Sequence, residues 1–259
     1  MEREQYAVMA RREDRHWWYA GMRRVALRVL DRALAGREGL LVLDAGCGTG
    51  GTTVRLGRYG RVVGLDLAWE ALRPAAERGL AGRLVRGSVE RLPFPSATFD
   101  AATSFEVVYH LGVANDELAL AELRRVLKPT GVLLLRVPAH DWLRGAHDRL
   151  VHTRHRYAPD EVRAKLERAG FSVERLTWAN SLLFPPAVAK RLLEGRAQDS
   201  WNHAPTPNGL APGAEPDLWQ PPRALNALLE SLVAVEALAL PRGLSLPFGL
   251  SVLAVARAL

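Results

Sequence analysis

LLVLDAGCGTGG, residues 40–51, changes from apolar to glycine-rich within a few positions. Its first four residues are Leu or Val, a run that predicts a strand buried on both faces. Asp44 closes the run, and Gly46, Gly48 and Gly50 follow at alternate positions. Glycine lacks a Cβ atom, so it permits positive φ angles and lets backbone amides lie against a ligand. The stretch therefore predicts a strand that ends in a ligand-binding turn.

Apolar runs of this kind recur along the chain and alternate with segments of helical periodicity. The predicted strands cover 40–46, 61–68, 83–89, 100–107, 131–139, 171–179 and 249–259. The predicted helices cover 17–35, 70–79, 115–129, a segment that starts at 158 and is capped near Asp160, and 222–240. Because buried strands that are each followed by a helix form parallel sheets, this order predicts an α/β fold with helices on both faces of the sheet.

The chain is predicted to fold as one domain with an insertion before its last strand. Residues 1–36 form an N-terminal helical segment, and residues 37–180 form the core. Residues 181–240 form a helical insertion, or cap, which includes a proline-rich loop at 196–222 with six prolines and no apolar period. Residues 241–259 return to the core as its terminal strand.

The composition is typical of a soluble globular protein, with 48% hydrophobic and 24% charged residues. The N-terminus is charged and lacks the apolar segment of a secretory signal. The longest apolar run near the end, which Glu230 and Glu236 interrupt, is too short for a membrane span. A single cysteine, Cys47, permits no internal disulfide. These observations predict a cytoplasmic protein without a transmembrane segment.

The formal net charge of +7 would suit a protein that binds nucleic acid or an anionic membrane. Only three of the 35 basic residues are lysine, and the arginines are scattered through the helical segments without a run of five or six. Dispersed charge of this kind is typical of a solvated surface. We therefore expect no nucleic-acid partner.

An acidic residue stands where a nucleoside cofactor would need one. The second predicted strand ends at Asp66, twenty residues after Gly46, and a carboxylate there can accept both hydroxyls of a ribose. Gly46, Gly48 and Gly51 also spell the GxGxxG pattern of dinucleotide sites. Asp44 argues against that alternative, because a carboxylate beside the glycine turn disfavours a pyrophosphate and favours a ligand that carries an ammonium group.

Four stretches, in this order along residues 40–171, resemble one known family. LDAGCGTG (43–50) is similar to the first motif of class I S-adenosylmethionine-dependent methyltransferases. The other three matches are RGSVERLPFPSATFDAATSFEVVYHL (86–111) to GDAExLPFxxxSFDxVxxxxVLEHL, LRRVLKPTGVLLLRVPA (123–139) to RxLKPGGxLxxxxP, and RHRYAPDEVRAKLERAGF (154–171) to RRYTxxELxxLLxxAGF. The chain is most similar to the small-molecule branch of the family, methyltransferase type 11, which includes quinone-biosynthesis enzymes.

The resemblance implies a Rossmann-like seven-stranded sheet of order 3-2-1-4-5-7-6 with an antiparallel last strand. It also implies S-adenosyl-L-methionine as the cofactor and S-adenosyl-L-homocysteine as the product. In this family the glycine turn passes beneath the methionine part of the cofactor, and the acid after the second strand binds the ribose. The residues expected to bind the cofactor are Asp44, Gly46, Cys47, Gly48, Gly50, Asp66, Leu67, Ser88, Val89 and Phe105, with Arg23 directed to the cofactor carboxylate.

One position departs from the family pattern. Where many relatives have an aspartate that accepts a hydrogen bond from the adenine amino group, this chain has Ser88, followed by Val89. A neutral acceptor forms a weaker hydrogen bond than a charged one. The Val89 amide can still serve the ring, so we expect the cofactor to bind, with a weaker contact to its adenine.

A base near the cofactor would speed methyl transfer to a hydroxyl by ~10²–10⁴-fold. His110 is the first candidate, because it stands where relatives carry the histidine of VLEHL; the alternative is a histidine that packs under the pocket and hydrogen-bonds the backbone. His152 and His155 are further candidates in the loop after the fifth strand. Other metal-ligand types in that loop are His140, His147, Asp141 and Asp148. Their spacing matches no metal motif, so we expect no metal.

Aromatic residues supply the candidates for acceptor binding. EDRHWWYAGMRR (13–24) resembles an HWWxxGRR opening found before the core in some relatives. Two adjacent tryptophans point to different faces of a helix, so at least one reaches a pocket or a partner surface, unless both serve to pack the helix on the core. The candidates for acceptor binding are Trp18, Tyr19, Tyr109 and Tyr157.

The sequence therefore predicts an S-adenosylmethionine-dependent methyltransferase that acts on a small molecule. Oxygen is the expected acceptor atom, with carbon and nitrogen as alternatives. The helix at 222–240 has an apolar face that can pack on the domain, dimerise, or rest on a membrane that holds a lipid-linked acceptor; its residues are Leu225, Leu228, Leu229, Leu232 and Val235. The acceptor is thus expected to be hydrophobic or lipid-linked, and the protein a monomer or homodimer. The alternative functions are an RNA methyltransferase and a methyltransferase-like binding protein without activity.

Overall fold

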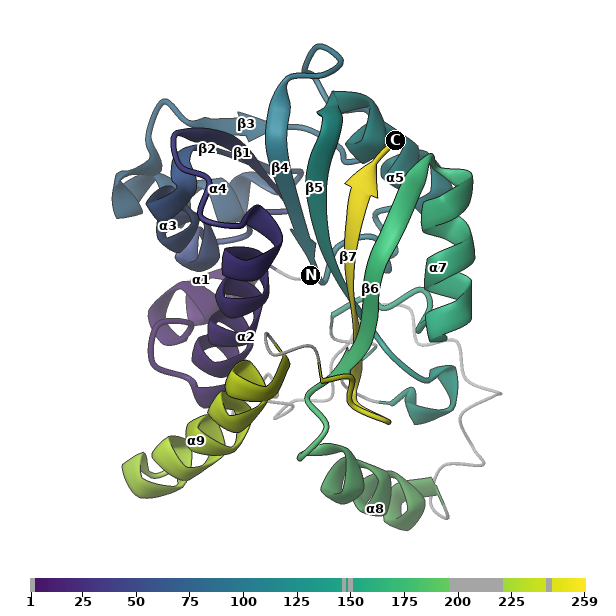
Figure 1. The fold of residues 1–259 in the computed structure, drawn as a ribbon. Coiled ribbons are helices and arrows are strands. Elements are labelled where there is room, and N and C mark those ends of the chain that lie inside the picture. Colours follow the sequence, from purple (N-terminus) through teal and green to yellow (C-terminus); the bar gives the residue numbers. More distant parts are fainter. Residues whose placement is uncertain (1–2, 146–147, 149–150, 196–220, 241–243) are drawn as a thin grey trace.

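Seven strands form one mixed sheet in the computed structural model, which describes residues 3–145, 148, 151–195, 221–240 and 244–259 (Figure 1). The strands are β1 (Leu40–Ala45), β2 (Gly60–Asp66), β3 (Leu84–Arg86), β4 (Phe99–Phe105), β5 (Leu127–Pro138), β6 (Phe171–Ala179) and β7 (Ser251–Ala258). Their order across the sheet is β3-β2-β1-β4-β5-β7-β6, and β7 runs antiparallel to both of its neighbours. The predicted fold class, strand order and antiparallel last strand are confirmed.

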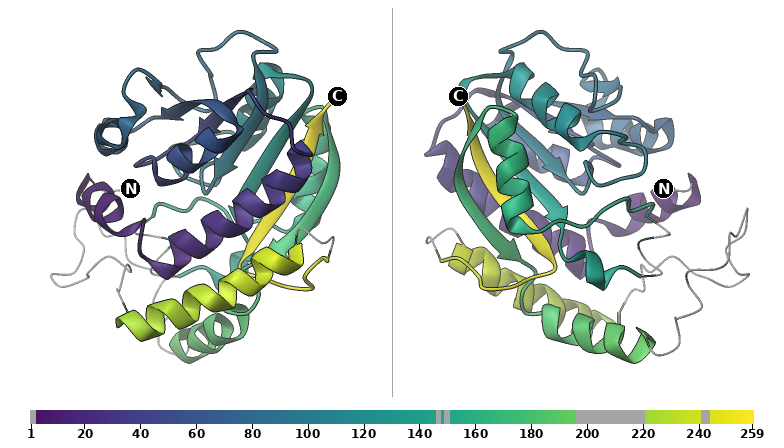
Figure 2. Two further views of the ribbon diagram at one scale, coloured as in Figure 1. Left: turned by 60° about the vertical axis from the view of Figure 1, so that its left-hand side comes forward. Right: turned by 90° about the vertical axis from the view of Figure 1, so that its right-hand side faces the viewer.

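Helices cover both faces of this sheet (Figure 2). The helices α2 and α9 contribute to the apolar cluster on one face, and α5 and α7 contribute to the cluster on the other. The α-helices are α1 (Arg3–Arg12), α2 (Trp17–Leu34), α3 (Gly51–Leu56), α4 (Trp69–Ala75), α5 (Asp116–Val126), α7 (Pro159–Arg168), α8 (Phe184–Gly195) and α9 (Arg223–Ala239). The shorter helical turns are η1 (Gly57–Tyr59), η2 (Ala76–Leu80) and η3 (Asp141–Leu143).

The strand β1 shows why its sequence is apolar at consecutive positions. Successive side chains of a strand point to opposite faces of the sheet. Val42 packs in the cluster that includes Leu30 of α2, whereas Leu43 packs in the cluster that includes Leu123 of α5. Both faces are covered by helices, so both sets of side chains must be apolar.

The helices α2 and α9 pack closely where α2 carries a glycine. A Cβ atom on Gly21 would lie 2.8 Å from Cβ of Val233, so a larger residue at this position would push the helices apart. The Asn226 side chain joins α9 to the start of α2. Its Oδ1 accepts from the Trp17 backbone N–H at 3.0 Å, and its amide donates to the Arg15 carbonyl at 3.0 Å.

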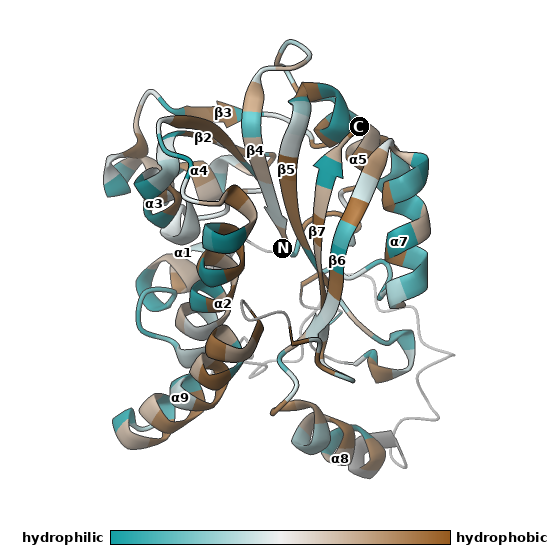
Figure 3. Cartoon of the chain, in the orientation of Figure 1, coloured by the Kyte–Doolittle hydropathy of each residue, from teal (hydrophilic) through white to brown (hydrophobic). Residues whose placement is uncertain are grey.

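The buried face of α9 differs from the predicted apolar face. Val233, Ala237 and Leu240 are buried, whereas Leu228 and Val235 are 57% and 56% exposed. Apolar residues surround much of this helix (Figure 3), so hydrophobic periodicity alone could not identify the side that packs. None of the described helices combines the length and the apolar content needed to cross a membrane.

Two predicted helix boundaries were wrong. The helix α7 begins at Pro159 after Ala158, and no side chain caps it. Proline at the first helical position lacks the N–H that a cap would satisfy, and Asp160 lies within the first turn instead. The helix predicted to reach residue 129 ends at Val126, before the Leu-Lys-Pro sequence that starts β5. Positions 196–220 of the predicted proline-rich loop lie outside the described residues.

Candidate active site

A crevice of about 770 Å³ lies at the carboxyl ends of β1, β2, β4 and β5. Parallel strands place the residues that follow them at one edge of the sheet, which is where α/β folds bind ligands. The helix α1 and the start of α2 form a second wall, and α8 lines the far part. Residues far apart in the sequence therefore meet around one space.

The glycine turn after β1 forms one side of the crevice. The Gly46 and Cys47 backbone N–H groups both donate to the Leu65 carbonyl at the end of β2, at 2.7 and 2.9 Å. Gly46 has a φ of 87°, and a Cβ atom there would overlap the Val107 side chain, so the turn requires glycine at this position. Gly46, Cys47 and Gly48 line the crevice, whereas Gly50 serves as the N-cap of α3 with a φ of 84°.

Asp66 lies beside this turn at the end of β2. One carboxylate oxygen accepts from the Gly48 N–H and the other accepts from the Ala68 N–H, both at 2.9 Å. Burial raises the pKa of Asp66, while these backbone hydrogen bonds act in the opposite direction. Each carboxylate oxygen keeps a lone pair for a further donor. Asp66 is thus held by the backbone and directed at the crevice, together with Leu67.

Asp44 organises the turn from below. Its two oxygens accept from the Thr53 hydroxyl at 2.6 Å and the Thr103 hydroxyl at 2.8 Å. The residue is 2% exposed, and burial raises its pKa. These bonds join β1 to α3 and β4, so the carboxylate fixes the turn in addition to lining the crevice.

The segment α1 and the loop after it close the crevice over the glycine turn. The Thr49 hydroxyl donates to the Glu13 carboxylate at 2.5 Å, and Arg78 forms an ion pair with the same oxygen at 2.9 Å. Tyr6 and Met9 of α1 also line the crevice. Burial and then the charge of Asp66 raise the pKa of Tyr6 to about 12, so this phenol stays protonated near the carboxylate.

The predicted adenine residues Leu67, Ser88 and Val89 all line the crevice. The Ser88 hydroxyl accepts from the Glu90 backbone N–H at 3.2 Å, and Val89 is buried. The hydroxyl therefore already stabilises its own turn, and it can donate one hydrogen bond to a ligand. A weaker adenine contact than a carboxylate would provide stays a prediction.

His110 lines the crevice, but its hydrogen bonding restricts its chemistry. Its Nδ1 accepts from the Gly112 backbone N–H at 2.9 Å, and its ring stacks on His152 with centroids 5.7 Å apart. Burial lowers the pKa of His110 to about 4, and the electrostatic effect of His152 contributes. A neutral ring whose Nδ1 accepts a hydrogen bond carries its proton on Nε2. Neither nitrogen can then take a proton from the methyl acceptor.

A buried arginine stands at the end of β4 and β5. Arg136 is 6% exposed, its Nε donates to Glu106 at 2.9 Å, and its guanidinium lies 5.5 Å from the Trp18 ring and 5.1 Å from the Phe105 ring. Glu106 has a φ of 59°, a value that side-chain-bearing residues rarely adopt. All four residues line the crevice, and Tyr109 does so as well.

Sequence reasoning missed Glu106 and Arg136. A signal was present, because Arg136 interrupts the apolar run of a strand predicted to be buried, and a buried arginine needs a partner. The pairing itself was not readable, since it depends on the register in which Phe105 of β4 lies beside Arg136 of β5.

Five predicted site residues lie outside the crevice lining, namely Gly50, Arg23, His152, His155 and Tyr157. Tyr157 is 2% exposed and donates to Asp116 at 2.6 Å, within the core on the α5 and α7 side. His155 pairs with Glu161 of α7 at 2.9 Å. Arg23 lines a separate hollow, because the face of α2 that carries it turns toward α3 instead of toward the glycine turn. His152 contacts the site through His110, on which its ring stacks.

The loop after β5 forms no metal cluster within the part of the chain that the structure describes, and His147 lies outside that part. Asp148 instead forms an ion pair with Arg156 at 2.8 Å. His140 stacks on Trp178 with ring centroids 4.6 Å apart. These contacts fix the loop to the core beside the crevice.

Residues 43–135, which hold the glycine turn, Asp66 and His110, match the protein family described as "Methyltransferase domain". This part of the chain is thus similar to methyltransferase domains. This finding confirms the resemblance on which the strand order and the cofactor residues were predicted.

Two curated relatives illustrate the sequence similarity of this chain to methyltransferases. A Mycolicibacterium smegmatis protein named "Probable S-adenosylmethionine-dependent methyltransferase" is 32% identical over 165 residues, which are 62% of each chain. The malonyl-[acyl-carrier protein] O-methyltransferase of Erwinia pyrifoliae is 43% identical over 108 residues, 41% of this chain and 40% of that protein. The chain spans about half the length of the curated relatives that it matches.

The fold similarity extends further along the chain than the sequence similarity. A chain from the complex between the Haloferax volcanii Trm112 methyltransferase activator and its methyltransferase covers 99% of this chain, which covers 96% of it in turn. The TM-score is 0.58 and the identity is 23%, so this likeness shows the fold alone.

Proposed function

We propose that this chain transfers the methyl group of S-adenosylmethionine to an oxygen atom of a small acceptor. The observation that carries the proposal is the position of Asp66. Two backbone hydrogen bonds hold its carboxylate beside the glycine turn, where it lines the crevice. The methyltransferase domain of residues 43–135 supports it.

The residues of the crevice fit the cofactor. Asp66 keeps lone pairs for two ribose hydroxyls after its bonds to Gly48 and Ala68, and Gly46 leaves no side chain above the turn. Leu67 and Val89 provide apolar surface for the adenine ring. S-adenosylmethionine supplies a methyl carbon that its positive sulfur activates, so the protein has to orient the acceptor and exclude water.

The acceptor oxygen is ionised before it binds. His110 presents no basic nitrogen, because its Nδ1 already accepts from Gly112. Arg136 lies in the same crevice, and within the described residues its terminal amino groups have no protein hydrogen bond. A cation held between Trp18 and Phe105 suits an acceptor that joins an anionic oxygen to an apolar body, such as a carboxylate or an acidic phenol. The named O-methyltransferase among the relatives supports oxygen as the acceptor atom.

Cofactor binding is tested by calorimetry with S-adenosylmethionine and S-adenosylhomocysteine. Asp66→Asn removes the charge but keeps the shape, and we expect its Kd for either ligand to rise about 10- to 100-fold, since hydrogen bonds to a charged group contribute ~1.5–3 kcal/mol. Asp160→Asn, at an exposed position of α7, is the matched control, and this variant should bind both ligands like the wild type. Absence of saturable binding to the wild type, or unchanged affinity of Asp66→Asn, would reject the proposal.

The acceptor class is tested separately, with methyl-labelled S-adenosylmethionine and a panel of aromatic and aliphatic carboxylic acids and phenols. Methyl esters are recognised because mild base releases their label as methanol. We expect Arg136→Gln to lower kcat/KM at least about tenfold, while S-adenosylhomocysteine affinity changes less than about threefold. Arg163→Gln on α7 is the control. Label transfer only to neutral amines or to carbon would contradict an ionised oxygen acceptor.

A further inference from the structure

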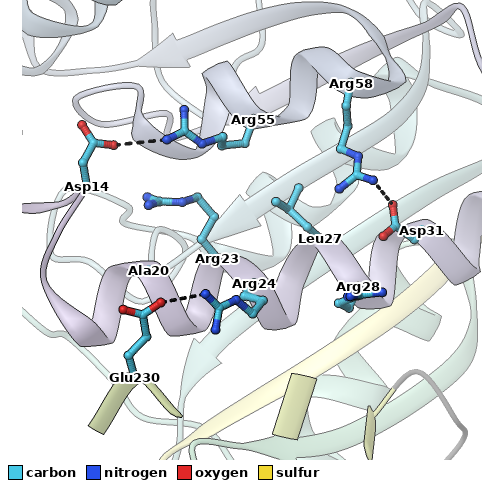
Figure 4. A pocket seen from close by; sticks show the side chains of 10 residues that line it. All are labelled: Asp14, Ala20, Arg23, Arg24, Leu27, Arg28, Asp31, Arg55, Arg58 and Glu230. Atoms are coloured by element: carbon cyan, nitrogen blue, oxygen red, sulfur yellow. Dashed lines mark hydrogen bonds and ion pairs between the residues drawn. The ribbon is translucent and has the colours of Figure 1, made fainter. Parts of the chain in front are cut away.

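A second hollow, of about 300 Å³, lies between α2 and the segment formed by α3 and η1 (Figure 4). None of the described residues lines both this hollow and the crevice. The residues that line it are Asp14, Ala20, Arg23, Arg24, Leu27, Arg28, Asp31, Arg55, Arg58 and Glu230. Half of them are arginines, which come from α2, α3 and η1.

The three carboxylates of the hollow do not balance its five arginines. Only the pair between Arg24 and Glu230 is short, at 2.7 Å. Arg55 lies 3.8 Å from Asp14, and Arg58 lies 3.7 Å from Asp31. The lining therefore carries a formal charge of +2, from five arginines and three acids.

The two distant carboxylates are already engaged by other donors. Arg78, outside the hollow, pairs with Asp14 at 2.6 Å. The Tyr59 hydroxyl donates to Asp31 at 2.8 Å. Each carboxylate is thus shared, and Arg55 and Arg58 keep donors for another acceptor.

Arg23 is the most buried of the five arginines. It is 9% exposed, and its hydrogen bond to the Glu13 carbonyl is long, at 3.4 Å. Burial and then the neighbouring Arg55 lower the pKa of Arg23. Figure 4 shows Arg23 extending from α2 toward the space between Asp14 and Arg55. An anion in that space would give this buried cation the close charged partner that the described residues do not provide.

We propose that the hollow is a binding site for the phosphate group of a small phosphorylated molecule. A phosphate monoester carries a charge of about −1.5 to −2 near neutral pH, which would neutralise the excess positive charge of the residues that line the hollow. Guanidinium groups bind phosphate oxygens in pairs, and the arginines here reach the hollow from both of its walls. Ala20 and Leu27 provide an apolar surface for the carbon part of the ligand.

Calorimetry and thermal unfolding at constant ionic strength test the site. The probes are inorganic phosphate, glycerol 3-phosphate and, as the uncharged control, glycerol. Arg55→Gln with Arg58→Gln is the main variant, because both side chains are about half exposed and the fold should tolerate their loss. Arg163→Gln with Arg168→Gln on α7 is the matched control, with the same charge change on exposed arginines. Arg23→Gln serves as a further variant where it folds.

We expect saturable binding of glycerol 3-phosphate, an increased Tm, and no effect of glycerol. The Arg55/Arg58 variant should weaken this binding at least about tenfold, from the loss of charge-assisted hydrogen bonds, and the α7 variant should stay within about twofold of the wild type. No saturable binding, or equal weakening in both variants, overturns the proposal. A single-stranded RNA of 20 nucleotides forms the last arm. RNA binding that the Arg55/Arg58 variant loses, without competition from glycerol 3-phosphate, would overturn a small-molecule site in favour of a nucleic-acid surface.

Discussion

His110 shows how one hydrogen bond limits the chemistry of a residue. Its Nδ1 accepts from Gly112, and burial, with a contribution from His152, lowers its pKa from 6.5 to about 4. Between these two pH values the unfolded chain binds a proton that the folded ring does not. The free energy of unfolding therefore falls as the pH decreases from 6.5 to about 4. Above pH 6.5 the ring is neutral in both states and causes no such loss.

We predict that His110→Asn reduces this pH dependence. Asparagine keeps an acceptor near the position of Nδ1 and has no titratable group. Chemical denaturation near pH 7.5 and near pH 4.5 measures the free energy of unfolding at both ends of this range. Between them it should fall by roughly 2 kcal/mol more for the wild type than for the variant, since one pKa unit corresponds to about 1.36 kcal/mol. Equal losses would mean that the ring titrates normally in the fold. Methyl transfer by His110→Asn should stay within about threefold of the wild type, which a general base would not allow.

Residues that act within one stretch of sequence were predictable, and residues that act through strand pairing were not. Gly46 and Asp66 each follow an apolar strand directly, so their position at the sheet edge follows from the sequence. Glu106 and Arg136 lie 30 positions apart and meet only because β4 and β5 are neighbours in register. His110 was placed correctly in the crevice, but its protonation state depends on its contact with Gly112.

At the scale of elements, α1 and the loop after it pack against the glycine turn and cover one side of the crevice. Glu13 accepts from Thr49 and pairs with Arg78 of η2, and it is 4% exposed. Glu13→Ala would leave both partners without this acceptor, so we predict a loss of about 2–3 kcal/mol in the free energy of unfolding. Asp14→Ala, next in sequence and more exposed, should lose less than about 1 kcal/mol.

Calorimetry on these two variants separates stability from closure of the crevice. Because Tyr6 and Met9 of α1 line the crevice, Glu13→Ala should also weaken S-adenosylhomocysteine binding by about five- to tenfold, since 1.4 kcal/mol is a factor of ten. Asp14→Ala should bind normally. If both variants bind equally well, α1 does not contribute to the cofactor site.

The second hollow, which five arginines line, could not be predicted from the sequence because it depends on how helices pack. The sequence shows no run of basic residues, which favoured a dispersed surface charge. Arg24 and Arg28 of α2 are nevertheless four positions apart, and Arg55 and Arg58 are three apart, so each pair lies on one side of its helical segment. That spacing was readable, but only the packing of α2 beside α3 and η1 brings the two sides together.

At the scale of the whole molecule, the core strands and the segment before β7 differ in what sequence can predict. The sheet order followed from motifs spread over β1 to α7, because the resemblance covered those elements. The helix α9 lies outside them and is apolar on several sides, so its contact with α2 through Val233 depends on shape at Gly21. A buried carboxylate of the same helix, Glu236, also attaches α9 to the loop after β6.

Glu236 connects α9 to the loop between β6 and α8. Its carboxylate accepts from the backbone N–H groups of Asn180, Ser181 and Leu182, at 2.6, 2.7 and 3.0 Å. The residue is 3% exposed, and burial raises its pKa. Because α8 and Asn180 line the far part of the crevice, this contact supports the region where the acceptor would bind.

We predict that Glu236→Ala lowers the free energy of unfolding by about 3 kcal/mol, since three backbone donors lose a buried charged acceptor. Glu230→Ala on the same helix removes only an exposed pair with Arg24 and should cost less than about 1 kcal/mol. Denaturation of both variants measures the difference. S-adenosylhomocysteine binding should persist in Glu236→Ala below its Tm, because Asp66 and the glycine turn lie on other elements. Similar stabilities for the two variants would show that the Glu236 carboxylate adds little to the contacts that hold α9 against α2.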